Sequence, residues 1–205
     1  MLNDTCYSDI VMDDVADARL RLFTGITLTD RVRAFASEIT RNLKEGVEGI
    51  RWVPEENLHV TLKFLGVTEP ESVTGILAEM NDAARGLPVE MMVGGVGGFP
   101  SHGSARIVYV GAEDPSGGLR EIHKRLESGL GRLGFEREKR AYRPHITVGR
   151  ARKKSVCLTG AAPFDEAEKE PLVVEGITLF RSVLERTGAR YTVIETVRGE
   201  AGRQG

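Results

Sequence analysis

The sequence predicts an α+β fold built as two related lobes, with the functional site in the groove between them. Three amphipathic helix patterns occur among about eight strand patterns. Several strands follow one another directly, which favours antiparallel or mixed sheets over a doubly wound parallel sheet. The order strand, helix, strand, strand, helix recurs loosely in each half, and each half contains one His-x-Thr motif. These observations together predict a pseudo-two-fold body.

Composition fits one soluble domain. A chain of 205 residues can bury a core as a single unit or as two lobes that share one. Residues 1–18 carry five aspartates and no basic residue, which predicts an acidic extension before a single bilobed domain at 19–198 and a tail at 199–205. No apolar run reaches about 18 residues, so no membrane span is expected. The isolated Cys6 and Cys157, together with the lack of a secretory pattern, favour a cytoplasmic location.

The first half of the chain predicts three strands and two helices. Thr29 is expected to cap the first helix, which should end at Gly46 or Gly49. Thr68-Glu69-Pro70-Glu71 has the pattern of a capping box for the second helix, which Gly86 should close. The expected strands are Leu20–Leu28, Ile50–Val53 and Leu58–Leu65, and the helical stripes are Val32, Phe35, Ile39 and Leu43, then Val73, Ile76, Leu77, Met80 and Ala84.

The second half predicts further strands and one helix. The glycine cluster at 94–98 follows a strand, but no Lys-Ser or Lys-Thr comes after it, so a bulged strand end is favoured over a phosphate loop. His123 flanks the helical stripe, where a structural or exposed role is the default. The chain should close with a hairpin at Glu185-Arg186-Thr187-Gly188. The strands are Val89–Val93, Arg106–Gly111, Tyr142–Arg150, Leu172–Phe180 and Arg190–Val197, and the stripe is Leu119, Ile122, Leu126, Leu130 and Leu133.

Two strands carry the same pattern, His-apolar-Thr-apolar. Because side chains alternate along a strand, His59 and Thr61 should share one face, and so should His145 and Thr147. Each pair spans about 7 Å along its strand. A lone histidine on a strand is usually structural, but two of the four histidines of the chain lie in matched settings. This favours one site assembled from two half-sites.

Two facing histidines suit acid–base chemistry. With an unperturbed pKa of about 6.5, one imidazole can take a proton while the other donates one. The two threonine hydroxyls and a cation would hold the oxygens of a phosphate. Arg150 is the first candidate for that cation, and Lys63, expected on the same face as Thr61, is the second. The residues alone leave open which histidine is acid and which is base.

A local excess of positive charge surrounds the second motif. The chain as a whole has a net charge of −2, but residues 136–154 contain eight basic and two acidic residues. This favours a phosphate-bearing ligand over a merely solvated surface. A zinc site would require a third ligand at usable spacing, which neither motif offers, so no metal is expected. Gly103-Ser104-Ala105 does not match the nucleophile elbow of a serine hydrolase.

The motifs resemble those of the 2H phosphoesterase superfamily, and within it the RNA 2′,3′-cyclic phosphodiesterases, also known as 2′-5′ RNA ligases. The resemblance covers roughly residues 20–197. It lies in stretches that occur in family order: Arg21-Leu22-Phe23; Asn57 to Gly66; Phe99-Pro100; Arg106 to Gly111; Arg143-Pro144-His145-Ile146-Thr147-Val148-Gly149-Arg150; Leu179 to Ser182; Gly188 to Tyr191. It implies the bilobed, LigT-like fold of that family, with sheets lining a central groove and helices outside.

The resemblance also implies an activity. The expected reaction is hydrolysis of RNA 2′,3′-cyclic phosphate ends to 2′-phosphates, without cofactor or metal, by a cytoplasmic monomer. His59 would be the proton donor and His145 the proton acceptor. The substrate would be held by Thr61, Thr147, Arg150, Lys63 and Arg143. Two alternatives stay open: a 2′-5′ RNA ligase acting on tRNA halves, and an RNA-end binding module without significant turnover.

Overall fold

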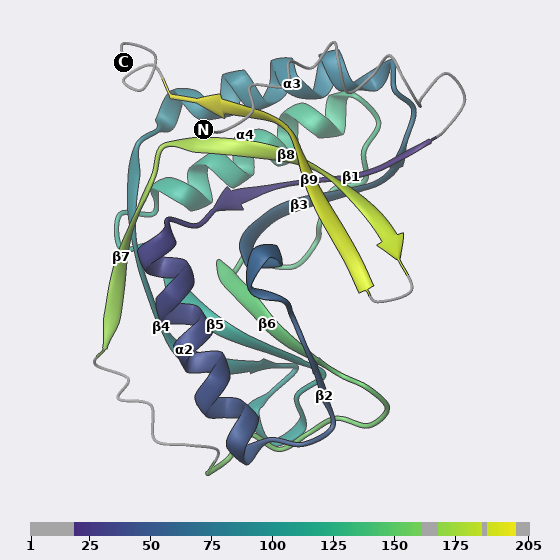
Figure 1. The fold of residues 1–205 in the computed structure, drawn as a ribbon. Helices are drawn as coiled ribbons and strands as arrows, with labels where there is room; N and C mark the ends of the chain where they lie inside the picture. The colour runs from purple at the N-terminus through teal and green to yellow at the C-terminus, as the bar shows by residue number, and fades with distance from the viewer. Residues whose placement is uncertain (1–18, 161–167, 186–187, 200–205) are drawn as a thin grey trace.

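The computed structural model describes residues 19–160, 168–185 and 188–199. Figure 1 shows them as one curled β-sheet with three α-helices packed against it. The strand order is β7-β4-β5-β6-β3-β1-β8-β9, and β2 pairs with β6 beside this path. The strands are β1 (Leu20–Thr27), β2 (Ile50–Trp52), β3 (His59–Thr68), β4 (Val89–Phe99), β5 (Ile107–Glu113), β6 (His145–Ala151), β7 (Lys169–Val174), β8 (Gly176–Glu185) and β9 (Gly188–Arg198). The helices are α2 (Asp30–Gly46), α3 (Ser72–Ala83) and α4 (Gly118–Arg132).

The sheet has two halves that meet at β3 and β6. Beyond β3 lie β1, β8 and β9, and beyond β6 lie β5, β4 and β7. The pairings among the described strands are antiparallel, and β3 and β6 share the single ladder pair Val60–Ile146. The predicted α+β fold is therefore confirmed, with one continuous sheet serving both halves. The expected acidic extension at 1–18 and the tail beyond 199 lie outside the described residues.

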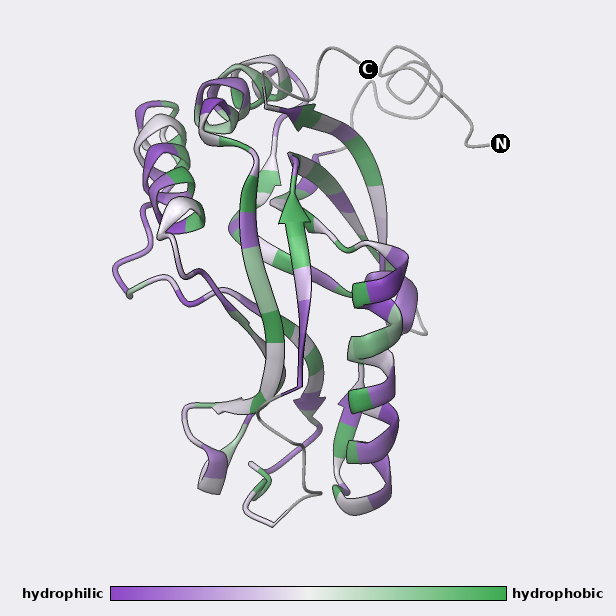
Figure 2. Cartoon of the chain, turned by 90° about the vertical axis from the view of Figure 1, so that its left-hand side faces the viewer, coloured by the Kyte–Doolittle hydropathy of each residue, from purple (hydrophilic) through white to green (hydrophobic). Residues whose placement is uncertain are grey.

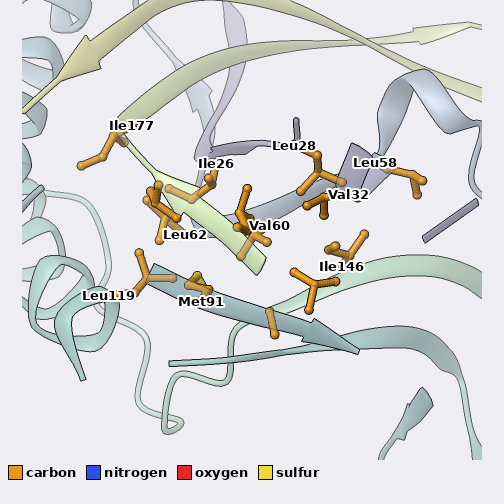
Figure 3. Close-up of a cluster of buried hydrophobic side chains, with 14 of the residues drawn as sticks. Ile26, Leu28, Val32, Leu58, Val60, Leu62, Met91, Leu119, Ile146 and Ile177 are labelled. Atoms are coloured by element: carbon orange, nitrogen blue, oxygen red, sulfur yellow. The ribbon is translucent and has the colours of Figure 1, made fainter. Parts of the chain in front are cut away.

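One hydrophobic core serves both halves. Val60 and Leu62 of β3, Ile146 of β6 and Val32 of α2 belong to the same buried cluster, which Figure 3 shows from close by. In Figure 2 the hydrophobic residues of α2 lie on the side of the helix that faces the strands. Burying this apolar surface is what holds the helices to the sheet. No helix in the described ranges combines the length and apolar character that a membrane span needs.

The start of α2 is as predicted. The Thr29 hydroxyl accepts a hydrogen bond from the backbone N–H of Val32, at 3.3 Å. The helix runs to Gly46, and Val32, Ile39 and Leu43 of the predicted stripe are buried. A side-chain cap of this kind satisfies one of the free N–H groups at a helix start. The sequence therefore placed the start of this helix correctly, and the helix ends at the first of the two predicted glycines.

The predicted capping box at Thr68 is wrong. Helix α3 begins at Ser72 without a side-chain cap, and Thr68 is the last residue of β3, where it pairs with Leu20 of β1. Its hydroxyl donates to the Gly66 carbonyl at 3.3 Å. The strand ladder retains Thr68, so its hydroxyl never reaches the helix. The local pattern could not reveal this because the competing partner lies 48 residues away in the chain.

The segment predicted as one strand at 172–180 forms two. β7 ends at Val174 and pairs with β4, whereas β8 starts at Gly176 and pairs with β1. The chain thus passes from one edge strand of the sheet to the other half at Glu175. The glycine cluster, by contrast, is the predicted bulged strand, because the β4–β5 register shifts between Val93 and Val96.

Candidate active site

The two His-x-Thr strands are neighbours at the centre of the sheet. β3 and β6 run antiparallel with Val60 opposite Ile146. His59 is therefore opposite Thr147, and Thr61 is opposite His145. Val60 and Ile146 are fully buried in the core, so the four polar side chains share the opposite face. The structure thus brings together the two half-sites that the sequence predicted.

Both imidazoles are oriented in the same way. Nδ1 of His59 lies 2.7 Å from the carbonyl oxygen of Asn57, and Nδ1 of His145 lies 2.7 Å from that of Arg143. A carbonyl oxygen can only accept, so each Nδ1 carries a hydrogen and donates it. Nε2 is therefore the nitrogen at which each ring can take up or release a proton. Nε2 of His59 also lies 3.0 Å from the Thr61 hydroxyl oxygen.

Each histidine packs against aromatic rings from the strands beyond it in its own half of the sheet. The His59 ring lies 4.9 Å from Phe23 of β1 and 5.7 Å from Phe180 of β8, which stack on each other at 4.8 Å. Tyr191 of β9 adds an edge contact at 5.3 Å. On the other half, His145 lies 5.2 Å from Tyr109 of β5 and 5.1 Å from Phe99 of β4, and those two rings stack at 4.5 Å. Rings packed in this way restrict both imidazoles to one orientation.

A β-bulge follows the threonine in both motifs. In the β1–β3 ladder the register skips Leu62, and in the β5–β6 ladder it skips Val148. Both skipped residues are buried. A bulge adds one residue to a strand, so the faces of the residues that follow it, up to any further bulge, are exchanged relative to simple alternation.

The bulge explains where the two candidate cations lie. Arg150 is exposed on the histidine side of β6, and its positive charge acts on both imidazoles. On β3 the position that corresponds to Arg150 is that of Phe64. Lys63 comes one residue earlier, so its side chain is turned to the opposite side of the strand, and 5% of its surface is exposed. The prediction that Lys63 shares the face of Thr61 is wrong, because strict alternation was assumed where the strand bulges. The structure therefore does not bring Lys63 to the site.

Lys63 instead links the two motif segments by hydrogen bonds, on the side of β3 away from the histidines. Its Nζ donates to both carboxylate oxygens of Glu127 on α4, at 2.8 and 2.9 Å, and to the Glu136 carbonyl at 2.6 Å. The Tyr142 hydroxyl donates to the Thr61 carbonyl at 3.1 Å. The segment at 136–142, which leads into the second motif, is thus hydrogen-bonded to the first motif strand.

The sequence did not single out Glu127 and Tyr142, and it assigned His123 only a default role. His123 is half-buried, stacks on Tyr142 at 4.0 Å, and has Nε2 3.8 Å from a Glu127 carboxylate oxygen. The available signal was Glu127 itself, a charged residue between the buried Leu126 and Leu130 of a helical stripe. A buried charge of this kind requires a partner.

The pKa of each candidate histidine lies below its ordinary value. Burial is the main cause for both rings. The backbone hydrogen bonds at Nδ1 raise the pKa and partly oppose burial, while the charge of Arg150 lowers it further. The pKa of His59 is also lowered by the charge of His145. Mutual repulsion of this kind means that protonating one ring disfavours protonating the other.

Arg143 differs from the other predicted residues. Its carbonyl oxygen orients His145, while its side chain is exposed and lines a separate cavity. Within the part of the chain that the structure describes, no three side chains of histidine, cysteine, aspartate or glutamate gather as metal ligands would.

The arrangement matches a known family along most of the chain. A family model described as the 2′-5′ RNA ligase superfamily matches residues 29–184. The chain belongs to this superfamily. The resemblance that the two motifs indicated is thereby confirmed.

Relatives of this superfamily member carry a consistent name. The RNA 2′,3′-cyclic phosphodiesterase of Methanothermobacter thermautotrophicus is 32% identical over 186 residues, which cover 88% of this chain and 99% of the relative. That of Thermotoga maritima is 31% identical over 187 residues, covering 89% and 97%.

Solved structures share the fold of this chain. The crystal structure of TT0787 of Thermus thermophilus has a TM-score of 0.72 at 30% identity and covers 88% of this chain and 100% of that one. The crystal structure of E. coli LigT complexed with 3′-AMP has a TM-score of 0.73 at 25% identity and covers 89% and 99%. The LigT-like fold expected from the motifs is thus confirmed.

Proposed function

We propose that the protein is an RNA 2′,3′-cyclic phosphodiesterase that opens the cyclic phosphate to a 2′-phosphate. The observation that carries this proposal is the pair of imidazoles on neighbouring strands, each with Nδ1 held by a carbonyl, which leaves Nε2 as the nitrogen that exchanges a proton. The names of the relatives support the same reaction.

The reaction requires one base and one acid. Nε2 of neutral His145 takes a proton from water as the water oxygen bonds to phosphorus. Nε2–H of protonated His59 gives its proton to the 3′ oxygen as the bond between phosphorus and that oxygen breaks. The products are a 2′-phosphate and a free 3′ hydroxyl. Exchange with solvent restores both rings.

Arg150 and the two threonines bind the charged oxygens of the phosphate. Arg150 acts on both histidines, so a phosphate between the rings would lie within reach of its guanidinium. Thr61 and Thr147 present hydroxyl donors on the same face. Donors already in place before the charge develops lower the barrier without reorganisation. Lys63 takes no part in this binding, since Glu127 holds its ammonium group away from the site.

Substrate charge also adjusts the acid–base pair. In the ligand-free protein the lowered pKa of both rings favours their neutral forms near pH 7. A bound anionic phosphate acts in the opposite direction to Arg150 and raises both pKa values. Binding therefore promotes the state in which one ring is protonated and the other is neutral.

The test is hydrolysis of 2′,3′-cyclic AMP in EDTA, with the position of the product phosphate read by phosphorus NMR. Turnover to 2′-AMP is expected to persist in the chelator. Formation of 3′-AMP would contradict the assignment of the leaving oxygen. Activity that disappears in EDTA and returns with an added divalent metal would overturn the two-histidine mechanism.

The family description favours one second candidate, joining of RNA ends through a 2′-5′ linkage. Ligation would be the same displacement at the same site, with a ribose 5′ hydroxyl in the place of water and the 3′ oxygen again leaving. Incubation with tRNA halves that carry a cyclic phosphate and a 5′ hydroxyl would reveal joined RNA. A reaction that yields 2′-phosphate ends and no joined product would exclude it.

A further inference from the structure

A basic cavity lies beside the candidate active site and has no role in the mechanism above. Its volume is about 560 Å³, which is in the range of sites for small organic ligands. Its walls come from α4 and from the segment that leads into the second motif. Among the residues of these walls are the exposed Arg120 and Lys124 of α4, and Tyr142 and Arg143 before β6.

The charges of this cavity are unbalanced. Its two carboxylates already have cationic partners: Glu127 holds the buried Lys63, and Glu138 holds Arg140 at 2.9 Å. Among the described residues, no carboxylate forms an ion pair with any of the three remaining cations, Arg120, Lys124 and Arg143. Asp114 lies nearby, but it is buried and accepts hydrogen bonds from the backbone N–H of Arg120 and from the hydroxyl of Ser116. The cavity therefore offers several free positive charges to an anion.

The cavity adjoins both histidine motifs. Arg143 lines it and orients His145 with its carbonyl. Tyr142 lines it with its ring and bonds the Thr61 carbonyl with its hydroxyl. Two residues of extended chain, about 7 Å, separate Arg143 from His145 along the backbone. The cavity and the His145 imidazole are thus connected by one short segment of chain, residues 142–145.

We propose that this cavity binds the backbone phosphate on the 5′ side of the cyclic end, so that the enzyme selects RNA oligonucleotides over cyclic mononucleotides. The proposal rests on the proposed function, because it takes the cyclic end to lie between His59 and His145. Arg120 and Lys124 are four residues apart on one face of α4, so one phosphate can contact both. Phosphate contacts of this kind do not depend on base identity.

The experiment compares two double variants that change net charge equally. Arg120→Gln with Lys124→Gln removes two cations from the cavity. Arg41→Gln with Lys44→Gln removes two exposed cations from α2 and serves as the matched control. Both pairs lie on helix surfaces, where such changes leave the fold intact. Substrates are 2′,3′-cyclic AMP and RNA of two and six nucleotides with cyclic ends.

The cavity variant should lower kcat/KM for the six-nucleotide RNA by about tenfold or more through KM, and leave hydrolysis of cyclic AMP unchanged. Its plot of log kcat/KM against log salt concentration for the RNA should be less steep by about 0.7 to 1.4, the slope for one or two single-strand phosphate contacts. The α2 control should match the wild type. Equal losses on cyclic AMP and RNA, or no loss on either, would overturn the proposal.

A binding measurement separates this proposal from the proposed function. Fluorescence anisotropy with labelled six-nucleotide RNA that ends in a 2′-phosphate requires no turnover. Weaker binding by the cavity variant, with unchanged binding by the α2 control, would support the cavity even if no cyclic substrate were hydrolysed. Equal affinity for all three proteins would overturn it even if hydrolysis were normal.

Discussion

The two halves of the site hold their histidines in the same way, but they differ in the residues that follow the bulge. In each half a histidine donates from Nδ1 to a carbonyl two residues earlier, stacked aromatic rings pack beside it, and a bulge follows the threonine. The two positions after the bulge differ. They hold Lys63 and Phe64 in the first half, and Gly149 and Arg150 in the second.

Each difference has a structural reason. Lys63 is buried against Glu127, whereas a Cβ at Gly149 would lie 2.5 Å from Cγ2 of Ile50, so only glycine fits there. Phe64 is 66% exposed and its ring lies 5.9 Å from that of Phe23, on the side of His59. Arg150 stands at the matching position near both histidines. Each half thus supplies one histidine for proton transfer, whereas the cation proposed to bind the phosphate, Arg150, comes from the second half alone.

The largest expected effect is on kcat and comes from replacing the two histidines, one in each half. His59→Ala and His145→Ala should each lower kcat on 2′,3′-cyclic AMP by about 10²- to 10⁴-fold, the range for losing a general acid or base. The double variant should be little worse than either single one, since the two rings act as a unit. Steady-state kinetics measure this, and circular dichroism checks the fold. A single variant with wild-type kcat would remove that histidine from the mechanism.

The next effect concerns the framework of the first half. Lys63→Met leaves the buried Glu127 carboxylate without its cation and should cost about 3–5 kcal/mol of unfolding free energy. Lys63→Met combined with Glu127→Leu removes both charges and should recover most of that loss. Urea denaturation measures both variants. If Lys63→Met alone is as stable as the wild type, the ion pair does not hold the two motif segments together.

The smallest effect is expected for Arg150, the cation that only the second half supplies. Arg150→Gln should lower kcat/KM about 100-fold, the scale for one donor to a developing oxyanion. The charge of Arg150 lowers the pKa of both histidines, so removing it should raise both values and move the bell-shaped kcat/KM profile to higher pH. Arg150→Lys keeps the charge and should leave the profile in place while part of the rate is lost. A profile that does not move in Arg150→Gln would contradict this electrostatic coupling.

Local patterns predicted the framework because the interactions that set it are local. The Thr29 cap joins residues three apart, and the faces of Val60 and Ile146 follow from alternation. The pairing of distant motifs was also predictable, because the repeated His-x-Thr pattern pointed to one shared site. Arg150 was placed with the histidines by its proximity in sequence and by resemblance.

The sequence could not reveal the orientation of Lys63. That orientation depends on the bulge at Leu62, which forms against β1, and on the Glu127 carboxylate 64 residues away. Neither partner is visible in the motif itself. The same limit applies to Thr68, whose competing strand partner is distant. It applies also to Glu175, where apolar residues continue on both sides although the strand before it pairs with β4 and the strand after it with β1.

The bulge at Val148 has a consequence for how the motif can vary. If Val148 took a place in the ladder instead of being skipped, plain alternation would turn Arg150 into the hydrophobic core, away from the histidines. An apolar replacement of similar size would keep the guanidinium where it is. The spacing of three residues from Thr147 to Arg150 therefore places both side chains on one face only in a bulged strand.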